Sequence, residues 1–178
     1  DTSMGITPLE GVIMGTRSGS MDPAVVQYIC NNEHISVDEM LTICNKKSGL
    51  LGISGLSSDM RDIDKAADEG NERANIARDM LVYGIRKYIG SYAAAMNGVD
   101  VIVFTAGIGE NNCALRERVM QGFEYLGAKL DPAKNAGCRE EAVISTDDSK
   151  VKICVIPTDE EIVIARDTLC IVTGKPIE

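Results

Sequence analysis

The chain has 178 residues, of which 44% are hydrophobic and 25% are charged, a composition typical of a globular protein with a substantial core. Its 27 acidic and 18 basic residues give a net charge of −9, which disfavours a surface for nucleic acid. Aromatic residues make up 4%, so stacking platforms for single-stranded nucleic acid are not expected either. Six scattered cysteines and one histidine lack the usual zinc-site spacings, and we expect the cysteines to be free thiols.

The N-terminal part reads as a glycine-rich loop followed by helices. The chain begins without an initiator Met, and we expect a piece of a longer protein. A turn bracketed by glycines presents Arg17. Asp22 before Pro23 predicts the start of one helix, and the capping-box pattern at 36–39 predicts a second. The apolar, glycine-broken run 50–56 indicates a short strand and a loop.

A polar helical stretch at 62–68 precedes the longest helical pattern, which runs from 72 to 96. Apolar residues recur there at three- and four-residue steps and form one stripe. Gly84 and Gly90 lie inside this helix, at a cost of about 1 kcal/mol each that close packing can offset. Asn97-Gly98 predicts its C-terminal end.

A strand and a glycine turn follow. Five of the six residues 99–104 are apolar, which predicts a strand buried on both faces. Gly107 and Gly109 then lead to Asn111 and Asn112, which can cap a helix. A strand that delivers a glycine turn to a helix N-terminus gathers backbone N–H groups, and this suits a phosphate or a nucleotide. The alternative is a tight turn in which the glycines only set the backbone geometry.

A second apolar strand at 151–156 leads through the capping segment 157–161 to a last helix at 162–169. The order of elements is α/β, with two strand-to-helix turns that can share one cleft. No apolar run reaches the ~18 residues of a membrane span, and we expect no signal peptide. We therefore expect a cytoplasmic protein.

The candidate site residues each have a functional and a structural interpretation. Arg17 offers a planar fork to a carboxylate or phosphate, or closes a turn at the surface. Asp59 and Arg61 contact a ligand, or form an ion pair within the loop. Asp159 and Glu160 hold Mg²⁺ together with substrate phosphates, or cap the last helix. The sequence contains no Walker A motif, kinase glycine loop or Ser-His-Asp set.

Six segments along the chain form a recognisable set: Asp1–Gly11, Met14–Gly19, Asn45–Gly55, Ser58–Asp62, Phe104–Asn111 and Ile156–Glu161. In sequence and in order they resemble the acetate kinases, the acetokinase family of the sugar kinase/Hsp70/actin superfamily. The resemblance covers only the C-terminal half of such an enzyme. It implies an α/β, actin-like ATPase (ribonuclease H-like) fold with a central mixed sheet flanked by helices. Residues 1–178 would be the C-terminal nucleotide-binding domain, with the N-terminal domain absent.

The resemblance also implies roles for individual residues. Arg17 matches the arginine that contacts the acyl carboxylate or the transferring phosphoryl group, and Glu160 matches the acidic residue associated with Mg²⁺ or Mn²⁺. Two segments match nucleotide contacts: Asp59, Met60, Arg61, Gly107, Ile108, Gly109, Glu110 and Asn111. Met60 stands where the family usually has an aromatic residue, so we expect an altered adenosine contact. Ser20 stands where an acidic residue is common, a minor departure.

The implied reaction is ATP + acetate ⇌ ADP + acetyl phosphate, catalysed by a homodimer without nucleic-acid or membrane partners. The family's N-terminal phosphate loop, a second arginine, a catalytic aspartate and the active-site histidines have no counterpart here. We therefore expect the isolated chain to be folded but essentially inactive, because domain closure needs the missing half. Two alternatives stay open: a propionate or butyrate kinase, and a non-catalytic nucleotide-binding or dimerisation module.

Overall fold

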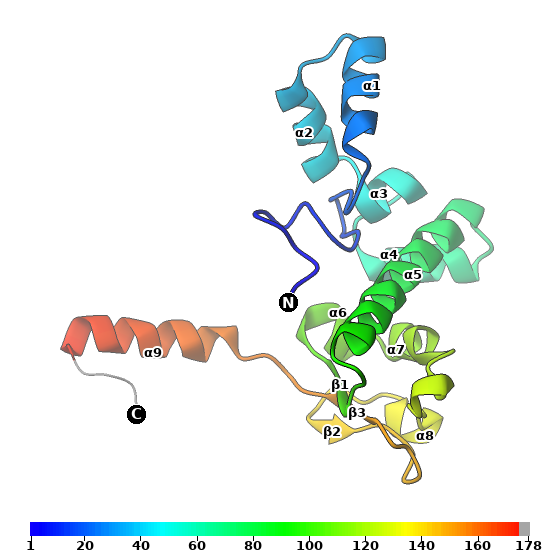
Figure 1. The fold of residues 1–178 in the computed structure, drawn as a ribbon, viewed down its shortest axis with the longest axis vertical. Coiled ribbons are helices and arrows are strands. Elements are labelled where there is room, and N and C mark those ends of the chain that lie inside the picture. Colours follow the sequence, from blue (N-terminus) through cyan, green and yellow to red (C-terminus); the bar gives the residue numbers. More distant parts are fainter. Residues whose placement is uncertain (175–178) are drawn as a thin grey trace. The chain divides into compact units, whose positions relative to one another are not determined.

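A computed structural model describes residues 1–174, apart from the Glu160 side chain, and forms two compact units. One unit ends at Gly98 and the other begins at Val99. Figure 1 labels the helices and strands of the chain. The first contains the helices α1 (Pro23–Glu33), α2 (Val37–Lys46), α3 (Gly49–Ser54), α4 (Met60–Asp68) and α5 (Glu72–Ala95). The second contains β1 (Val101–Phe104), α6 (Ala106–Asn111), α7 (Cys113–Met120), the 3-10 helix η1 (Glu124–Leu126), α8 (Pro132–Asn135), β2 (Ala142–Val143), β3 (Lys152–Val155) and α9 (Glu160–Thr173).

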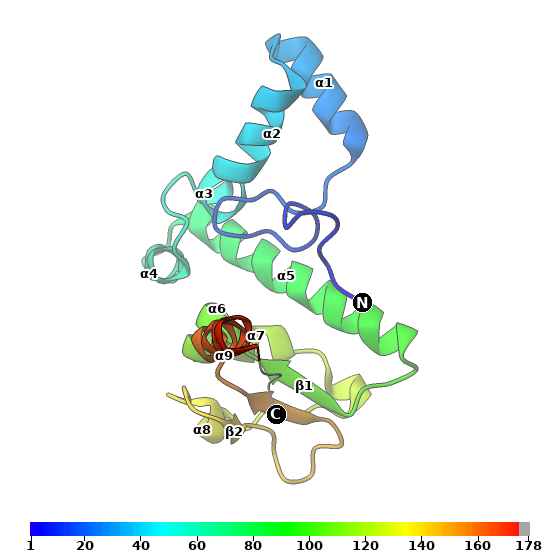
Figure 2. The same cartoon turned by 90° about the vertical axis from the view of Figure 1, so that its left-hand side faces the viewer.

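The helices α1 and α2 form a hairpin at the start of the first unit (Figure 2). Their predicted starts are confirmed. The Asp22 carboxylate accepts a hydrogen bond from the Ala24 amide at 2.9 Å, with a proline at the first helical position. Ser36 and Glu39 form the reciprocal capping box, with bonds of 3.2 and 2.8 Å between each side chain and the other's amide. These caps satisfy amides that have no partner inside the helix.

The strand predicted over 50–56 is wrong, because this segment forms the helix α3. Gly49 adopts a φ of +60°, which turns the chain into the helix at a conformation that other residues disfavour. Leu50 points into the core. A short apolar run has the same pattern in a buried strand and in a buried helix, so the sequence could not separate the two.

The helices α4 and α5 confirm the predicted polar helix and the predicted long helix. The helix α5 packs against α3 and α4 and buries Ala74, Ala77 and Leu81 from its apolar stripe. Gly84 does not require the close packing we expected. A Cβ atom at this position would meet only a Val12 methyl carbon, at 3.4 Å, which is an ordinary contact.

The second unit contains a mixed three-stranded sheet in the order β1-β3-β2, as the fold prediction required. The strands β1 and β3 are parallel, with Ile102 opposite Ile153, and β2 is antiparallel to β3. Burial of β1 on both faces is wrong. Ile102 and Phe104 are buried, whereas Val101 and Val103 are each 45% exposed. The strand lies at the sheet edge and only one of its faces meets the core, so its side chains alternate.

All six cysteines are free thiols, as predicted. Across residues 1–174, no helix is both long enough and apolar enough to cross a membrane.

Candidate functional site

Arg17 lies on a loop that hydrogen bonds fix against α2 and α3. The Thr16 hydroxyl donates to the Asn45 carbonyl at 2.8 Å, and the Ser18 amide donates to the Cys44 carbonyl at 2.9 Å. Three amides at the start of α3 donate to loop carbonyls at 2.9 to 3.0 Å: Ser48 to Thr16, Leu50 to Met14 and Leu51 to Gly15. The loop backbone is therefore held from both sides, which gives the Arg17 side chain a fixed base.

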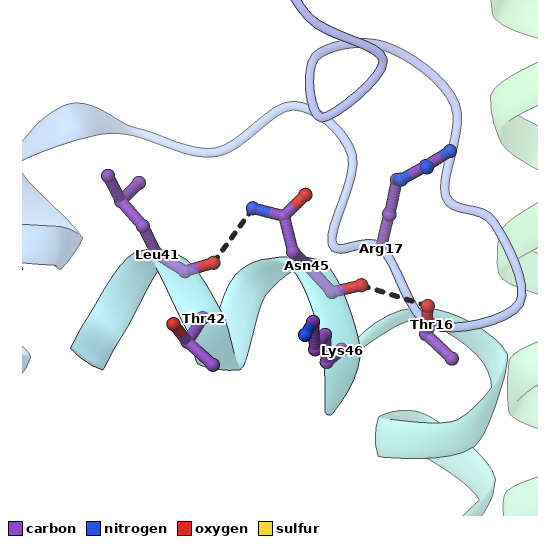
Figure 3. A pocket seen from close by; sticks show the side chains of 6 residues that line it. All are labelled: Thr16, Arg17, Leu41, Thr42, Asn45 and Lys46. Atoms are coloured by element: carbon purple, nitrogen blue, oxygen red, sulfur yellow. Dashed lines mark hydrogen bonds between the residues drawn. The ribbon is translucent and has the colours of Figure 1, made fainter. Parts of the chain in front are cut away.

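A pocket of about 430 Å³ opens beside Arg17 (Figure 3). Its lining residues are Thr16, Arg17, Leu41, Thr42, Asn45 and Lys46. The Arg17 guanidinium makes one polar contact, from Nη1 to the Met14 Sδ at 3.3 Å. Among the residues that the structure describes, no carboxylate lies within ion-pair distance of Arg17. A pocket lined by two cations and no acid suits a small anion.

Asp59 is the N-cap residue of α4 and pairs with Arg61. The Asp59 carboxylate accepts the Arg61 amide at 2.8 Å and the Arg61 Nε at 3.0 Å. These hydrogen bonds, from the guanidinium first, lower the pKa of Asp59 to about 2. The ion-pair interpretation is thus confirmed, while the Arg61 side chain stays 89% exposed. Met60 is 5% exposed and belongs to the core, so it presents little side-chain surface to a ligand.

The segment after β1 is the short helix α6, not the glycine turn we predicted. Ala106 adopts a φ of 58° and makes the change of direction that was assigned to the glycines. This left-handed conformation costs an L-residue about 1–2 kcal/mol, and such strain clusters at functional sites. A Cβ at Gly109 would lie 3.3 Å from the Phe104 carbonyl carbon, whereas a Cβ at Gly107 would meet nothing within 4 Å. Gly109 therefore packs closely against the backbone of Phe104, whereas Gly107 leaves its backbone uncovered.

The two asparagines after these glycines have different roles. Asn112 accepts the Leu115 amide at 2.8 Å and caps α7, as predicted. Asn111 turns back instead, and its Nδ2 donates to the Gly107 carbonyl at 2.9 Å. Ile108 is 43% exposed on the same helix.

Glu110 joins the two strand-to-helix turns of the second unit. One carboxylate oxygen accepts the Thr158 amide at 2.8 Å and the Thr158 hydroxyl at 3.0 Å. These bonds, the amide first, hold the pKa of Glu110 below its usual range. Because β1 and β3 are parallel neighbours, their carboxyl ends meet at one edge of the sheet. The expected approach of the two turns is confirmed, and the Glu110 carboxylate is already engaged in it.

Arg116 on α7 is a residue that the sequence analysis missed. It is 0% exposed, and its Nη1 donates to the Gly109 and Glu110 carbonyls at 2.8 Å each. The signal was present, since a charged residue at 116 shares a helical face with the apolar residues Val119 and Met120. A cation on an apolar face indicates either a buried hydrogen-bond network or a site.

The segment before α9 contains the acidic candidates. Asp159 Oδ1 accepts the Ile162 amide at 3.0 Å, which confirms the capping interpretation for this residue. Glu160 is the first residue of α9, and its side chain lies outside the described part of the structure. Among the side chains that are described, no three His, Cys, Asp or Glu residues come together as a metal site.

The family assignment follows from comparison with known proteins. A sequence model of the acetokinase family matches residues 1–166. The chain belongs to the acetokinase family. Among solved structures, acetokinase-family folds match it closely. A crystal structure of Porphyromonas gingivalis acetate kinase has a TM-score of 0.90 at 50% identity, over 96% of this chain and 43% of that one. The actin-like α/β fold class is thereby confirmed.

Two further acetokinase relatives differ in the substrate that their names give. An acetate kinase of Thermoanaerobacterium thermosaccharolyticum is 59% identical over 94% of this chain and 42% of its own length. A propionate kinase of Francisella tularensis subsp. tularensis has a TM-score of 0.86 at 42% identity, over 93% of this chain and 42% of that one. The chain thus spans less than half the length of the relatives it matches.

Proposed function

We propose that the whole protein is an acetate kinase, which reversibly transfers the γ-phosphoryl group of ATP to acetate to give acetyl phosphate and ADP. One observation carries the proposal: the 59% identity to the Thermoanaerobacterium acetate kinase over 94% of this chain. Residues 1–178 are then the C-terminal nucleotide-binding domain, and an N-terminal domain completes the site. The isolated chain is expected to lack activity.

Arg17 is proposed as the catalytic residue that contacts the acyl carboxylate or the transferring phosphoryl group. Enzymes catalyse phosphoryl transfer mainly by positioning and by neutralising charge. An arginine on a backbone fixed by α2 and α3, beside a pocket without acids, supports both roles.

The nucleotide is proposed to bind at two segments. Asp59, Met60 and Arg61 form the adenosine side, where the exposed Arg61 guanidinium offers a contact and Met60 contributes by anchoring the segment in the core. Gly107 to Asn111 form the phosphate side. The open backbone surface at Gly107 and the strained Ala106 support this assignment.

Mg²⁺ (or Mn²⁺) is proposed as the cofactor, with Glu160 as its protein ligand. When bound, the ion neutralises charge on the phosphates, and Mg²⁺ is commonly held by one or two carboxylates plus substrate phosphates. The change Glu160→Ala in the full-length protein is expected to weaken the dependence of rate on Mg²⁺ concentration. An unchanged dependence would leave Glu160 as a helix-terminal residue only.

A chimera tests the proposed reaction directly. This chain replaces the matching segment of the Thermoanaerobacterium relative, and acetyl phosphate formation from ATP and acetate is measured. The chimera is expected to be active, whereas the 178-residue chain alone is expected to be inactive. The relative's own enzyme is the positive control. A folded chimera that binds ATP but forms no acetyl phosphate would refute the assignment.

Propionate or butyrate as the acyl substrate is the second candidate, and the match to the Francisella propionate kinase favours it. Comparing kcat/KM for acetate, propionate and butyrate in the active chimera and in the full-length protein decides between them. A preference for propionate or butyrate in the full-length protein would replace acetate as the substrate.

We also propose that this domain carries a homodimer contact. Ile76, Met80 and Tyr83 are exposed at helical spacing on one face of α5, and a second copy would cover such a face. Sedimentation of the chain is expected to show a concentration-dependent dimer. A monomer at high concentration would contradict the dimer contact. A dimer in sedimentation together with an inactive chimera would support the non-catalytic alternative.

A further inference from the structure

The guanidinium of Arg116 is the most completely hydrogen-bonded charge in the described part of the second unit. Its Nη1 donates to the Gly109 and Glu110 carbonyls at 2.8 Å each. Its Nε donates to Asn135 Oδ1 at 2.8 Å, and its Nη2 donates to the Asn135 and Cys138 carbonyls at 3.2 and 2.9 Å. A guanidinium has five N–H groups, and each of them has an acceptor here.

These bonds join three segments that are separate in the sequence. The first is the C-terminal half of α6, the second is the end of α8 at Asn135, and the third is the loop at Cys138. The Asn135 Nδ2 closes the network by donating to the Cys113 carbonyl at 2.9 Å, at the start of α7. The side chain of Arg116 therefore crosslinks α6 to α8 and to the loop at Cys138.

This crosslink is costly to maintain. All five acceptors are neutral, and in the described residues no carboxylate pairs with Arg116. Burial accordingly lowers the pKa of Arg116. Burying a charge without a counter-charge costs free energy, and five hydrogen bonds offset that cost here. A planar fork with five donors reaches all of these acceptors at once and fixes the positions of the carbonyls, which a lysine ammonium with three donors cannot do.

We propose that Arg116 is a positioning residue for the nucleotide. It holds the Gly109 and Glu110 carbonyls in place, and so fixes α6 and the Glu110 bond to Thr158 without touching the ligand. The inference rests on the proposed function, because the proposed function assigns the phosphate side of the nucleotide to α6. It predicts that the geometry of the fork matters and that positive charge alone is insufficient.

The change Arg116→Lys tests this, since lysine keeps the charge and up to three donors but loses the planar fork. Hydrogen exchange in the 178-residue chain is expected to accelerate at the amides of α6 and at Thr158, with the α5 amides unchanged. Arg78→Lys is the matched control, because Arg78 is also buried but bonds to the Asp68 carboxylate in the first unit. Unchanged exchange at α6 would overturn the proposal.

Steady-state kinetics of the full-length enzyme supply the readout that a purely structural residue would not move. Arg116→Lys is expected to raise KM for ATP at least about tenfold, because misplaced groups bind their ligand poorly, while KM for acetate stays within about twofold. Arg78→Lys should change neither value. Faster exchange at α6 with an unaltered KM for ATP refutes the positioning role. A wild-type enzyme without ATP-dependent activity instead refutes the proposed function. The hydrogen-exchange result on how Arg116 holds α6 would remain valid in that case.

Discussion

Gly49 offers a sharp test of how the Arg17 loop is held. The change Gly49→Ala adds a Cβ only 2.0 Å from the Met14 carbonyl oxygen, at a φ of +60°. Ordinary contact begins at 3.4 Å, so this oxygen must retreat by roughly 1.4 Å. The same oxygen accepts the Leu50 amide at 2.9 Å. The substitution therefore pushes apart the loop and the start of α3.

The expected loss of stability has two parts, and a second glycine separates them. An alanine with positive φ costs about 1–2 kcal/mol, and overpacking adds about 1–3 kcal/mol. The control is Gly55→Ala, which has nearly the same φ of +68° but meets only the Arg73 guanidinium, at 3.5 Å. Gly55→Ala has the cost of positive φ but no overpacking cost. Gly49→Ala should therefore be less stable than Gly55→Ala by at least about 1 kcal/mol.

Urea unfolding followed by circular dichroism measures this difference. With a slope of about 1–3 kcal/mol per molar, the Gly49→Ala midpoint should lie below that of Gly55→Ala by at least roughly 0.3–1 M, depending on the slope. Hydrogen exchange at the Leu50 and Leu51 amides should also accelerate in Gly49→Ala only. Equal midpoints for the two variants would refute the reasoning, because they would mean that the loop yields to the added carbon without cost.

Three further predictions concern strain, pH and charge. Ala106→Gly should leave the free energy of unfolding unchanged or raise it by up to about 1 kcal/mol. Ala94→Gly within α5, the control, should lower it by about 0.5–1 kcal/mol. Equal losses of this free energy, measured by urea unfolding, would contradict backbone strain at Ala106. The hydrogen bond that the Thr158 amide donates to the Glu110 carboxylate lowers the pKa of Glu110. The ionised Glu110 therefore stabilises the fold above pH 4.5 and loses that effect as the pH falls further. Glu110→Gln should weaken the pH dependence of the free energy of unfolding, measured by urea titration between about pH 6 and about pH 3. The same pH dependence in the variant and the wild type would argue against the hydrogen bond between Thr158 and Glu110. Arg17→Ala should lower kcat of the full-length enzyme about 100-fold, since one charge-stabilising contact to the transition state is worth about 3 kcal/mol. Lys46→Ala, which removes the other cation of the same pocket, is the control. A changed KM for acetate with an intact kcat would limit Arg17 to substrate binding.

Local signals in the sequence predicted the helix starts well. Asp22, Ser36 and Asn112 cap the helices that their patterns indicated, because a capping bond involves only residues within one turn. The long helix and both parallel strands were also predicted, since their apolar residues repeat with the period of the element.

The errors fall where distant contacts decide the structure. The segment after Ser48 became a helix because the loop around Met14 and Gly15 accepts its first amides, a contact that no local pattern contains. The glycines at 107 and 109 were assigned a turn that Ala106 makes instead. The strand β1 lies at a sheet edge and is half covered, which its composition alone does not reveal.

The sequence by itself determined the family resemblance, the long helix, the two parallel strands and, through the resemblance, the candidate residues Arg17 and Glu110. These depend on residue identity and short spacing, which the sequence states directly. Only the tertiary structure decided that Glu110 accepts hydrogen bonds from Thr158 and that Arg116 crosslinks α6 to α8. Such roles depend on which segments meet in space, and a buried hydrogen-bond network is set by three-dimensional proximity that sequence spacing does not record.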